Sequence, residues 1–230
     1  MEAEKTKKES VNKATPILRP RTSMIVAGPT GVGKTHFAIR LLKHARTMYG
    51  EADAPVRTFY FYGVYQDRFD TLEDEIEGLS LRQGLPPRDF FDGLDRSEHC
   101  CLVLDDLLVD AVNSKDVAEI FTRGCHHYNL SLMYLVQNVL QQGKMARLIA
   151  LNTSYMVLFR QPRDYAQFAY LGRQMYPFAP QRFLECYTHA VSRPHGYLFV
   201  DNLPSTEEND RLASNILPDE ADDLTLYCPL

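Results

Sequence analysis

Residues Gly28–Thr35 read GPTGVGKT, and this short stretch constrains the architecture of the 230-residue chain more than any other. It agrees with the pattern G-x-x-x-x-G-K-[ST] at every fixed position. Glycines at 28, 31 and 33 let the backbone turn tightly, so that several N–H groups can face one anion. The stretch therefore predicts a phosphate-binding loop (P-loop), in preference to an ordinary glycine-rich turn.

The flanking residues supply the strand and the helix that such a loop needs. Met24–Ala27 form an apolar run that predicts a strand, and apolar residues at helical spacing predict a helix over 34–49, followed by Gly50. The N-terminus of this helix would point the positive end of its dipole at a bound phosphate. The local context therefore favours a nucleotide site, and we expect ATP with Mg²⁺ as its ligand.

Two side chains of the loop have expected chemical roles. The ammonium group of Lys34 should reach the β- and γ-phosphates and take part in catalysis, and the hydroxyl group of Thr35 should bind Mg²⁺. Backbone N–H groups would supply the other contacts. The expected ATP-binding residues are Gly28, Pro29, Thr30, Gly31, Val32, Gly33, Lys34 and Thr35.

Two adjacent carboxylates end the apolar run CCLVLDDLL at 100–108. A buried charge is costly unless it has a partner, and a P-loop supplies one. We expect Asp105 to bind Mg²⁺ directly or through water, as the acid that follows a buried strand in P-loop proteins does. Asp106 is expected to act as the catalytic base on the attacking water. The alternative for Asp106 is a helix cap or a group that orients another side chain.

A further polar side chain, Gln137, ends the buried run LMYLVQN. The carboxyl ends of the strands border the ligand crevice of an open α/β sheet, so Gln137 could sense the γ-phosphate or orient the water. An ordinary amide at a strand end is the alternative. Ring-forming ATPases often complete the site with an arginine from the neighbouring subunit. The candidates for this arginine are Arg123, Arg147, Arg160, Arg163 and Arg173.

The rest of the chain alternates between predicted strands and helices, which indicates an α/β fold with a mostly parallel central sheet and helices on both faces. Further strands are expected from Arg57, Leu130, Ser154 and His195, the last closing the sheet, and helices over 114–125, 163–175 and 180–191. Residues 66–99 are expected to connect elements, with one short helix near 70–77.

Three segments are predicted from composition. Residues 1–20 are rich in lysine and predict a mobile basic arm, and 21–218 should form one P-loop ATPase domain. Residues 219–230 carry four acids and no base, which predicts an acidic tail that either docks on a partner or aids solubility.

Composition narrows the class of protein further. The five cysteines, an odd number without paired spacing, favour a reduced intracellular compartment. No apolar window is long enough for a membrane span, so a membrane partner is not expected. The net charge of -5 neither supports nor excludes a nucleic-acid partner.

Three features together resemble the HerA/FtsK superfamily of DNA-pumping ATPases. They are the strand that ends in Asp105 and Asp106, the strand that ends in Gln137, and the stretch ARLIALNTSYMVLFRQPRD at 146–164. The chain is most similar to the genome-packaging ATPases of double-stranded DNA viruses in the poxvirus-like and Polinton/adintovirus-like group. Similar aromatic strands, like FYFYGVYQ here, follow the P-loop helix in that group. The resemblance covers roughly residues 20 to 218.

The resemblance implies a RecA-like P-loop NTPase of the additional-strand type, which hydrolyses ATP to translocate double-stranded DNA into a capsid. It implies a ring-shaped homo-oligomer, a pentamer or hexamer, with a capsid or portal protein as a further partner. The location implied is the nucleus or cytoplasm of a host cell, or the virion. Arg147 matches a basic residue of the family and ranks ahead of Arg123 and Arg173 as the arginine finger or DNA-coupling residue. Asp106 departs from the glutamate that many such motors have.

No DNA-reading module is visible in the sequence, so DNA contacts are expected from loops that face a pore. Such contacts would bind phosphates regardless of base sequence and would weaken with salt. Arg68, Lys144 and Arg147 are the candidates. Two other classes remain open: a small P-loop nucleotide kinase, which would need an arginine-rich lid, and a nucleotide-dependent assembly protein with little turnover.

Overall fold

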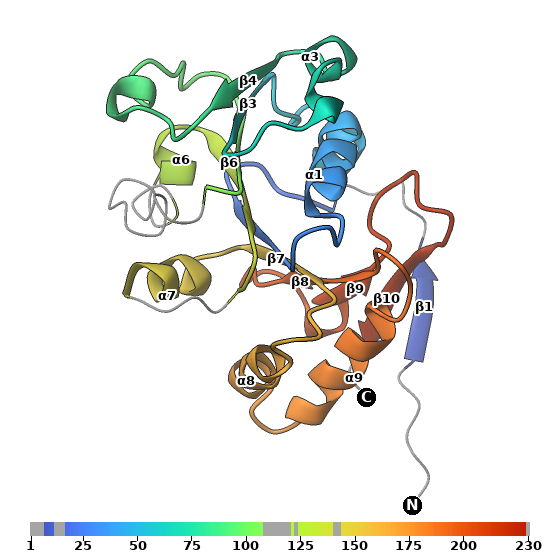
Figure 1. Cartoon of the computed structure of the whole chain (residues 1–230). Helices are drawn as coiled ribbons and strands as arrows, with labels where there is room; N and C mark the ends of the chain where they lie inside the picture. Colours follow the sequence, from blue (N-terminus) through green and yellow to red (C-terminus); the bar gives the residue numbers. More distant parts are fainter. Residues whose placement is uncertain (1–6, 12–16, 108–120, 122–123, 140–143, 229–230) are drawn as a thin grey trace, which may run out of the picture.

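The computed structural model describes residues 7–11, 17–107, 121, 124–139 and 144–228 (Figure 1). Its described residues form a ten-stranded sheet in the order β1-β10-β9-β8-β7-β2-β6-β5-β3-β4. The strands are β1 Lys7–Val11, β2 Ser23–Ala27, β3 Arg57–Tyr62, β4 Leu79–Gln83, β5 Cys100–Asp105, β6 Leu130–Val136, β7 Tyr155–Phe159, β8 Tyr197–Asp201, β9 Leu212–Ser214 and β10 Leu224–Cys228. The α-helices are α1 Lys34–Lys43, α2 Ala45–Tyr49, α3 Leu72–Glu75, α6 Cys125–His127, α7 Lys144–Leu151, α8 Ala166–Met175 and α9 Pro180–Ala190.

The strands that carry the predicted motifs lie together in the parallel part of the sheet. Strands β4, β3, β5, β6, β2 and β7 run parallel, whereas β8, β9, β10 and β1 extend the sheet from β7 with antiparallel pairs. Strand β6 separates β2, which leads into the P-loop, from β5, which ends in Asp105. The predicted α/β fold with a mostly parallel sheet is confirmed.

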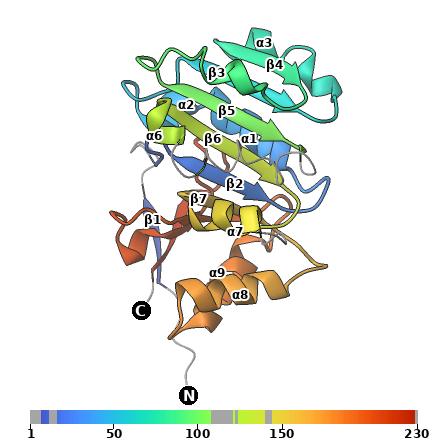
Figure 2. The same cartoon turned by 90° about the vertical axis from the view of Figure 1, so that its left-hand side faces the viewer.

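Each central strand is buried on both faces, as a parallel sheet between helix layers requires. In β2, Ile25 packs in the core beneath α8 and α9, whereas Val26 packs on the opposite face beneath α1. Figure 2 looks onto one face of the sheet, with α1 and α2 behind it and α7 in front. Burial of one such side chain contributes about 1.5–3 kcal/mol to the free energy of unfolding. This two-sided core therefore holds the carboxyl ends of the strands in place.

Several elements differ from the sequence-based predictions. The helix expected over 34–49 is divided, because His44 leaves the helical conformation (φ -104°, ψ 17°) between α1 and α2. Residues 66–99 contain α3 where a short helix was expected, but they also contain the edge strand β4. Strand β4 was missed because it is short and half exposed, and its parallel pairing with β3 depends on a segment outside it. The helix expected over 114–125 falls largely outside the described residues.

The terminal segments also differ. Residues 7–11, expected in a mobile arm, form β1, which pairs with β10 of the expected acidic tail. The sheet therefore does not end at the strand from His195, because β9, β10 and β1 continue it. Antiparallel pairing between the two ends of the chain leaves no local signal in either segment. Among the described helices, none is long and apolar enough to cross a membrane.

Candidate nucleotide site

The P-loop joins β2 to α1 and is shaped by its glycines. Gly31 and Gly33 have positive φ values of 80° and 115°, which other residue types adopt only with strain. At Gly28 the constraint is space, because an added Cβ would lie 2.7 Å from the Cβ of Phe159. Helix α1 begins at Lys34, so the free N–H groups of its first turn face the loop. The predicted strand, loop and helix therefore occur in the expected order.

The side chain of Lys34 folds back over the loop. Its Nζ donates hydrogen bonds to the backbone oxygens of Gly28, at 2.7 Å, and Pro29, at 3.1 Å. Burial lowers the pKa of Lys34, while the charges of Asp105 and Asp106 act in the opposite direction. The ammonium group thus lies across the concave side of the loop, where a phosphate would replace the two carbonyl oxygens as its partner.

Asp105 occupies the position that its sequence predicted, at the end of β5 and beside the P-loop helix. Its side chain is only 3% exposed, and Oδ2 accepts hydrogen bonds from Thr35 Oγ1 at 2.8 Å and from Tyr60 Oη at 2.7 Å. Burial raises the pKa of Asp105, and the hydrogen bonds from Tyr60 and Thr35 oppose that rise. The hydroxyl oxygen of Thr35 and a carboxylate oxygen of Asp105, which come from distant parts of the chain, therefore meet at one end of the loop.

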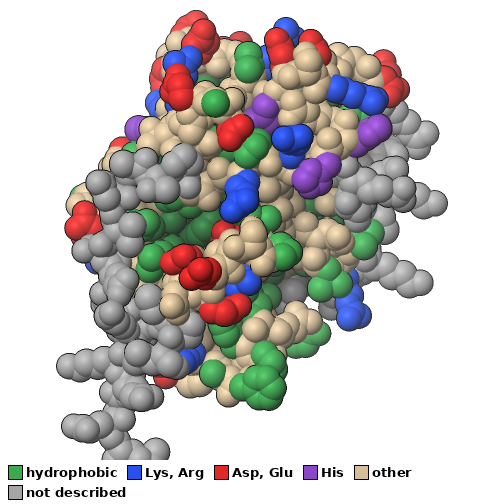
Figure 3. Space-filling view, turned by 180° about the vertical axis from the view of Figure 1, so that it is seen from behind, with side chains coloured by type: hydrophobic (Ala, Val, Ile, Leu, Met, Phe, Trp, Pro, Cys, Tyr) green, Lys and Arg blue, Asp and Glu red, His purple; other side chains and the backbone are tan. Residues whose placement is uncertain are grey.

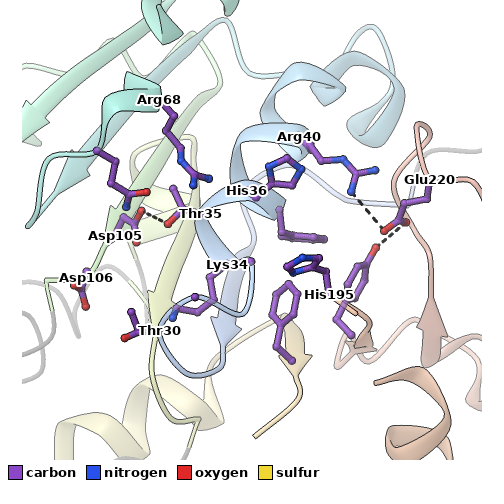
Figure 4. A pocket seen from close by; sticks show the side chains of 16 residues that line it. Thr30, Lys34, Thr35, His36, Arg40, Arg68, Asp105, Asp106, His195 and Glu220 are labelled. Carbon is purple, nitrogen blue, oxygen red and sulfur yellow. Dashed lines mark hydrogen bonds and ion pairs between the residues drawn. The ribbon is translucent and has the colours of Figure 1, made fainter. Parts of the chain in front are cut away.

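Asp106 differs from its neighbour in conformation and exposure. Its φ is 55°, a left-handed conformation that Asp tolerates better than most residues, and it is exposed. The turn is crowded, since a Cβ added to Gly63 would lie 2.5 Å from the backbone oxygen of Asp106. This sharp turn directs Asp105 into the protein and leaves Asp106 on the wall of the cavity (Figure 4).

A cavity of about 510 Å³ opens over the P-loop, a size typical of small-molecule sites. Figure 4 shows its two halves. The first half contains Thr30, Lys34, Thr35, Asp105 and Asp106, with Gln66 and Arg68 from the segment after β3. The second half contains His36, Arg40, His195, Tyr197 and Glu220. The volume and the two halves fit a nucleotide, with its phosphates against the loop.

The second half of the cavity was not predicted from the sequence. His195 has a left-handed φ of 59° and its Nδ1 lies 2.9 Å from the backbone oxygen of Val32 in the P-loop. Arg40 pairs with Asp219 through Nε and Nη2, and Tyr197 donates to Glu220 at 2.9 Å. These residues come from α1, from the turn before β8, from the first residue of β8 and from the segment after β9. No local pattern marks them, because only the fold brings them together.

Tyr60 and Arg68 were also missed as parts of this site. Tyr60 belongs to the aromatic run that predicted only a strand, and Tyr62 of the same strand pairs with Asp105. Alternation along β3 therefore places Tyr60 where its hydroxyl reaches the buried carboxylate. Arg68, a candidate DNA contact from the sequence, lines the cavity.

Gln137 and Arg147 are not brought into the cavity. Gln137 is exposed just after β6, and its backbone oxygen accepts a hydrogen bond from Gln161 Nε2 at 3.3 Å. Arg147 is exposed on α7 and does not line the cavity. Arg160, Arg163 and Arg173 are exposed and do not line it either, while Arg123 and the side chain of Lys144 lie outside the described residues.

The parallel sheet, the loop between β2 and α1, and the carboxylate facing Thr35 define an α/β protein of the P-loop NTPase kind. No protein-family model and no curated protein matches the chain. Its fold is similar to that of the genome packaging NTPase B204 from Sulfolobus turreted icosahedral virus 2 in complex with ATP-gammaS. The identity is 10%, the match covers 91% of this chain and 98% of that chain, and the TM-score is 0.52.

Two further solved structures of B204 are similar. The DNA-packaging ATPase B204 from Sulfolobus turreted icosahedral virus is 11% identical over 80% of this chain and 94% of that chain, with a TM-score of 0.49. The AMPPCP complex of the B204 protein from Sulfolobus turreted icosahedral virus 2 is 11% identical over 91% of this chain and 98% of that chain, also with a TM-score of 0.49. At these identities the likeness concerns the fold.

Proposed function

We propose that this protein is an ATP-hydrolysing DNA translocase that packages viral DNA. The observation that carries the proposal is the hydrogen bond of 2.8 Å between Thr35 and Asp105 at the end of the P-loop. A hydroxyl and a carboxylate beside a phosphate-binding loop are the arrangement that P-loop NTPases use to hold Mg²⁺. The fold shared with the packaging NTPase B204 supports the choice of packaging among the many uses of this chemistry.

The residues present fit ATP and Mg²⁺. The N–H groups of the P-loop and of the first turn of α1 would bind the phosphates, and Lys34 would exchange its two backbone oxygens for phosphate oxygens. Thr35 and Asp105 would hold Mg²⁺, which prefers hard oxygen ligands and neutralises charge on the phosphates. Burial raises the pKa of Asp105, and a cation bound beside the carboxylate would act in the opposite direction.

Asp106 is the proposed catalytic base. Its exposed carboxylate lines the cavity, so it can accept a proton from water as the water oxygen attacks the γ-phosphorus and the bond to the leaving ADP oxygen breaks. Gln137 and Arg147 do not line the cavity of their own chain. We propose that Gln137 relays the state of the γ-phosphate and that Arg147 acts on the nucleotide of a neighbouring subunit or on DNA.

The additional-strand class is our assignment, and the position of β6 between β2 and β5 supports it. This class fits the HerA/FtsK-type viral packaging ATPases, for which a pentameric or hexameric ring and a capsid or portal partner are the proposed assembly. Figure 3 shows the face opposite to that of Figure 1, where acidic and basic side chains of the described residues are interspersed. We propose phosphate contacts from loops inside a ring as the mode of DNA binding.

The proposal is tested by steady-state ATP hydrolysis with and without linear duplex DNA. We expect DNA to stimulate turnover, and Asp106→Asn to abolish it while ATP binding is retained. Asp92→Asn is the matched control, because Asp92 is an exposed acid that does not line the cavity. Mg²⁺-dependent ATP binding without turnover would instead indicate an assembly protein, and phosphoryl transfer to a nucleoside or nucleotide would indicate a kinase.

A further inference from the structure

Among the residues that the structure describes, Arg40 and Arg68 line the cavity, and of these two Arg40 has a described acidic partner. Arg40 donates from Nε and Nη2 to the carboxylate of Asp219, at 2.9 and 2.7 Å, so its guanidinium fork is occupied. The guanidinium of Arg68 has no hydrogen-bond or ion-pair partner among the residues that the structure describes. A guanidinium group binds phosphate through paired N–H donors, so an unpaired one above a phosphate-binding loop is suited to an anionic ligand.

The backbone beside Arg68 is fixed at the metal-binding end of the site. Arg68 lies in the short 3-10 helix Asp67–Phe69, and Phe69 is 2% exposed. The ring of Phe69 lies 5.5 Å from that of Tyr60, whose hydroxyl holds Asp105. One buried aromatic contact therefore links the position of Arg68 to the carboxylate that faces Thr35.

The side chain of Arg68 points into the phosphate half of the cavity. Figure 4 shows its guanidinium group directed at Thr35 and Asp105, on the side opposite to Arg40. The electrostatic influence of Arg68 is consistent with this position. The pKa of His36 is lowered by burial, then by the charge of Arg40 and then by that of Arg68. The positive charge thus extends over the first turn of α1, where phosphates would lie.

We propose that Arg68 binds the γ-phosphate of the nucleotide held by its own chain. The inference rests on the proposed ATPase function and adds to it a catalytic residue that acts in cis. In hydrolysis, water attacks the γ-phosphorus and the bond to the bridging oxygen breaks, while Arg68 stabilises the charge on the non-bridging oxygens. This role is an alternative to the DNA contact that the sequence suggested for Arg68. It would give each site an arginine of its own chain in addition to any arginine from a neighbouring subunit.

The decisive experiment compares a nucleotide that has a γ-phosphate with one that lacks it. Binding of ATPγS and of ADP is measured by calorimetry for the full chain and for Arg68→Ala and Arg68→Lys. We expect Arg68→Ala to weaken ATPγS binding about 10-fold or more and to change ADP binding less than about 2-fold. Arg68→Lys should be intermediate, because lysine keeps the charge but not the fork. Turnover should fall by about 100-fold in Arg68→Ala.

Arg57→Ala is the matched control. Arg57 is the first residue of β3, whereas Arg68 comes after the end of that strand. Arg57 pairs with Glu98 on the surface. Equal losses for ATPγS and ADP, or no loss for either, would overturn the inference. So would a loss of DNA binding at unchanged nucleotide binding. Failure of the unmodified chain to bind either nucleotide would refute the proposed function itself, which keeps the two failures distinct.

A mixing experiment separates action in cis from action in trans. Lys34→Ala subunits keep Arg68 but should not hydrolyse ATP, and Arg68→Ala subunits keep the P-loop. If Arg68 served the neighbouring subunit, mixing the two variants would restore turnover at part of the sites. We expect no restoration, and recovered turnover would assign Arg68 to the trans position instead.

Discussion

The hydroxyl of Thr35 and the carboxylate of Asp105 are joined by a hydrogen bond of 2.8 Å across a separation of 70 positions in the chain. Thr35 is the last residue of the P-loop motif and lies in the first turn of α1, whereas Asp105 ends β5, which β6 separates from β2. The contact therefore depends on the strand order of the whole parallel sheet. It brings a hydroxyl oxygen and a carboxylate oxygen together at the place where the loop would hold a phosphate.

Asp105 is expected to reduce the stability of the protein without nucleotide. Burial raises its pKa in the folded state, so the folded protein binds more protons than the unfolded chain. Stability should therefore fall as the pH rises from the ordinary Asp pKa through the raised value. We expect Asp105→Asn to raise the melting temperature at neutral pH by a few degrees and to abolish Mg²⁺-dependent hydrolysis. A lower melting temperature at neutral pH would contradict this account.

Gly33→Ala should affect both stability and nucleotide binding. The φ of 115° at Gly33 is strained for alanine, and the new Cβ would lie 3.1 Å from His195 Nδ1. Left-handed backbone costs about 1–2 kcal/mol outside glycine. Gly84→Ala is the control, because Gly84 has a φ of 86° with no atom within 4 Å of the added Cβ and does not line the cavity. Urea unfolding should show losses in both variants, and ATPγS binding should weaken only in Gly33→Ala.

Gln161 should support turnover from outside the cavity. It is 7% exposed, and its Nε2 donates to the backbone oxygen of Gln137 and, at 3.0 Å, to Asn138 Oδ1. Gln161→Met keeps the length of the side chain but removes both donors. If the loop at Gln137 relays the nucleotide state, kcat should fall several-fold while the KM for ATP stays unchanged. Gln174→Met, on the exposed side of α8, is the control, and equal effects of the two variants would argue against a relay.

The ion pair of Arg40 with Asp219 should contribute little to stability at neutral pH. Its side chains are 24% and 38% exposed, and exposed pairs are worth about 0–1 kcal/mol. The hydrogen bond from Arg40 lowers the pKa of Asp219, so the contribution is present above the ordinary Asp pKa and is lost as the pH falls through the lowered value. Urea unfolding of Asp219→Asn should show a small deficit at pH 7 that shrinks toward pH 3. A deficit independent of pH would exclude an ionic origin.

Much of the fold follows from local patterns in the sequence. The P-loop pattern, the apolar run before Asp105 and the alternation of strands with helices each depend on neighbouring residues, and the structure has these elements where they were expected. The ends of the helices and strands were less predictable. The edge strand β4 depends on its pairing with β3, and the end of α2 is held by hydrogen bonds from the distant residues Ile17 and Leu18 to the backbone oxygen of Met48.

The sequence by itself determined that this chain has a P-loop motif between a strand and a helix and a buried acid at a strand end, because both depend on consecutive residues whose types allow few other structures. Only the tertiary structure decided which groups surround that loop. Arg68, His195 and Glu220 reach the same cavity from three separate segments, and the buried hydroxyl of Tyr60 holds Asp105 at its edge. Their meeting depends on strand order and pairing register, which arise from burial and hydrogen bonding across the whole sheet and leave no trace in the residues beside them.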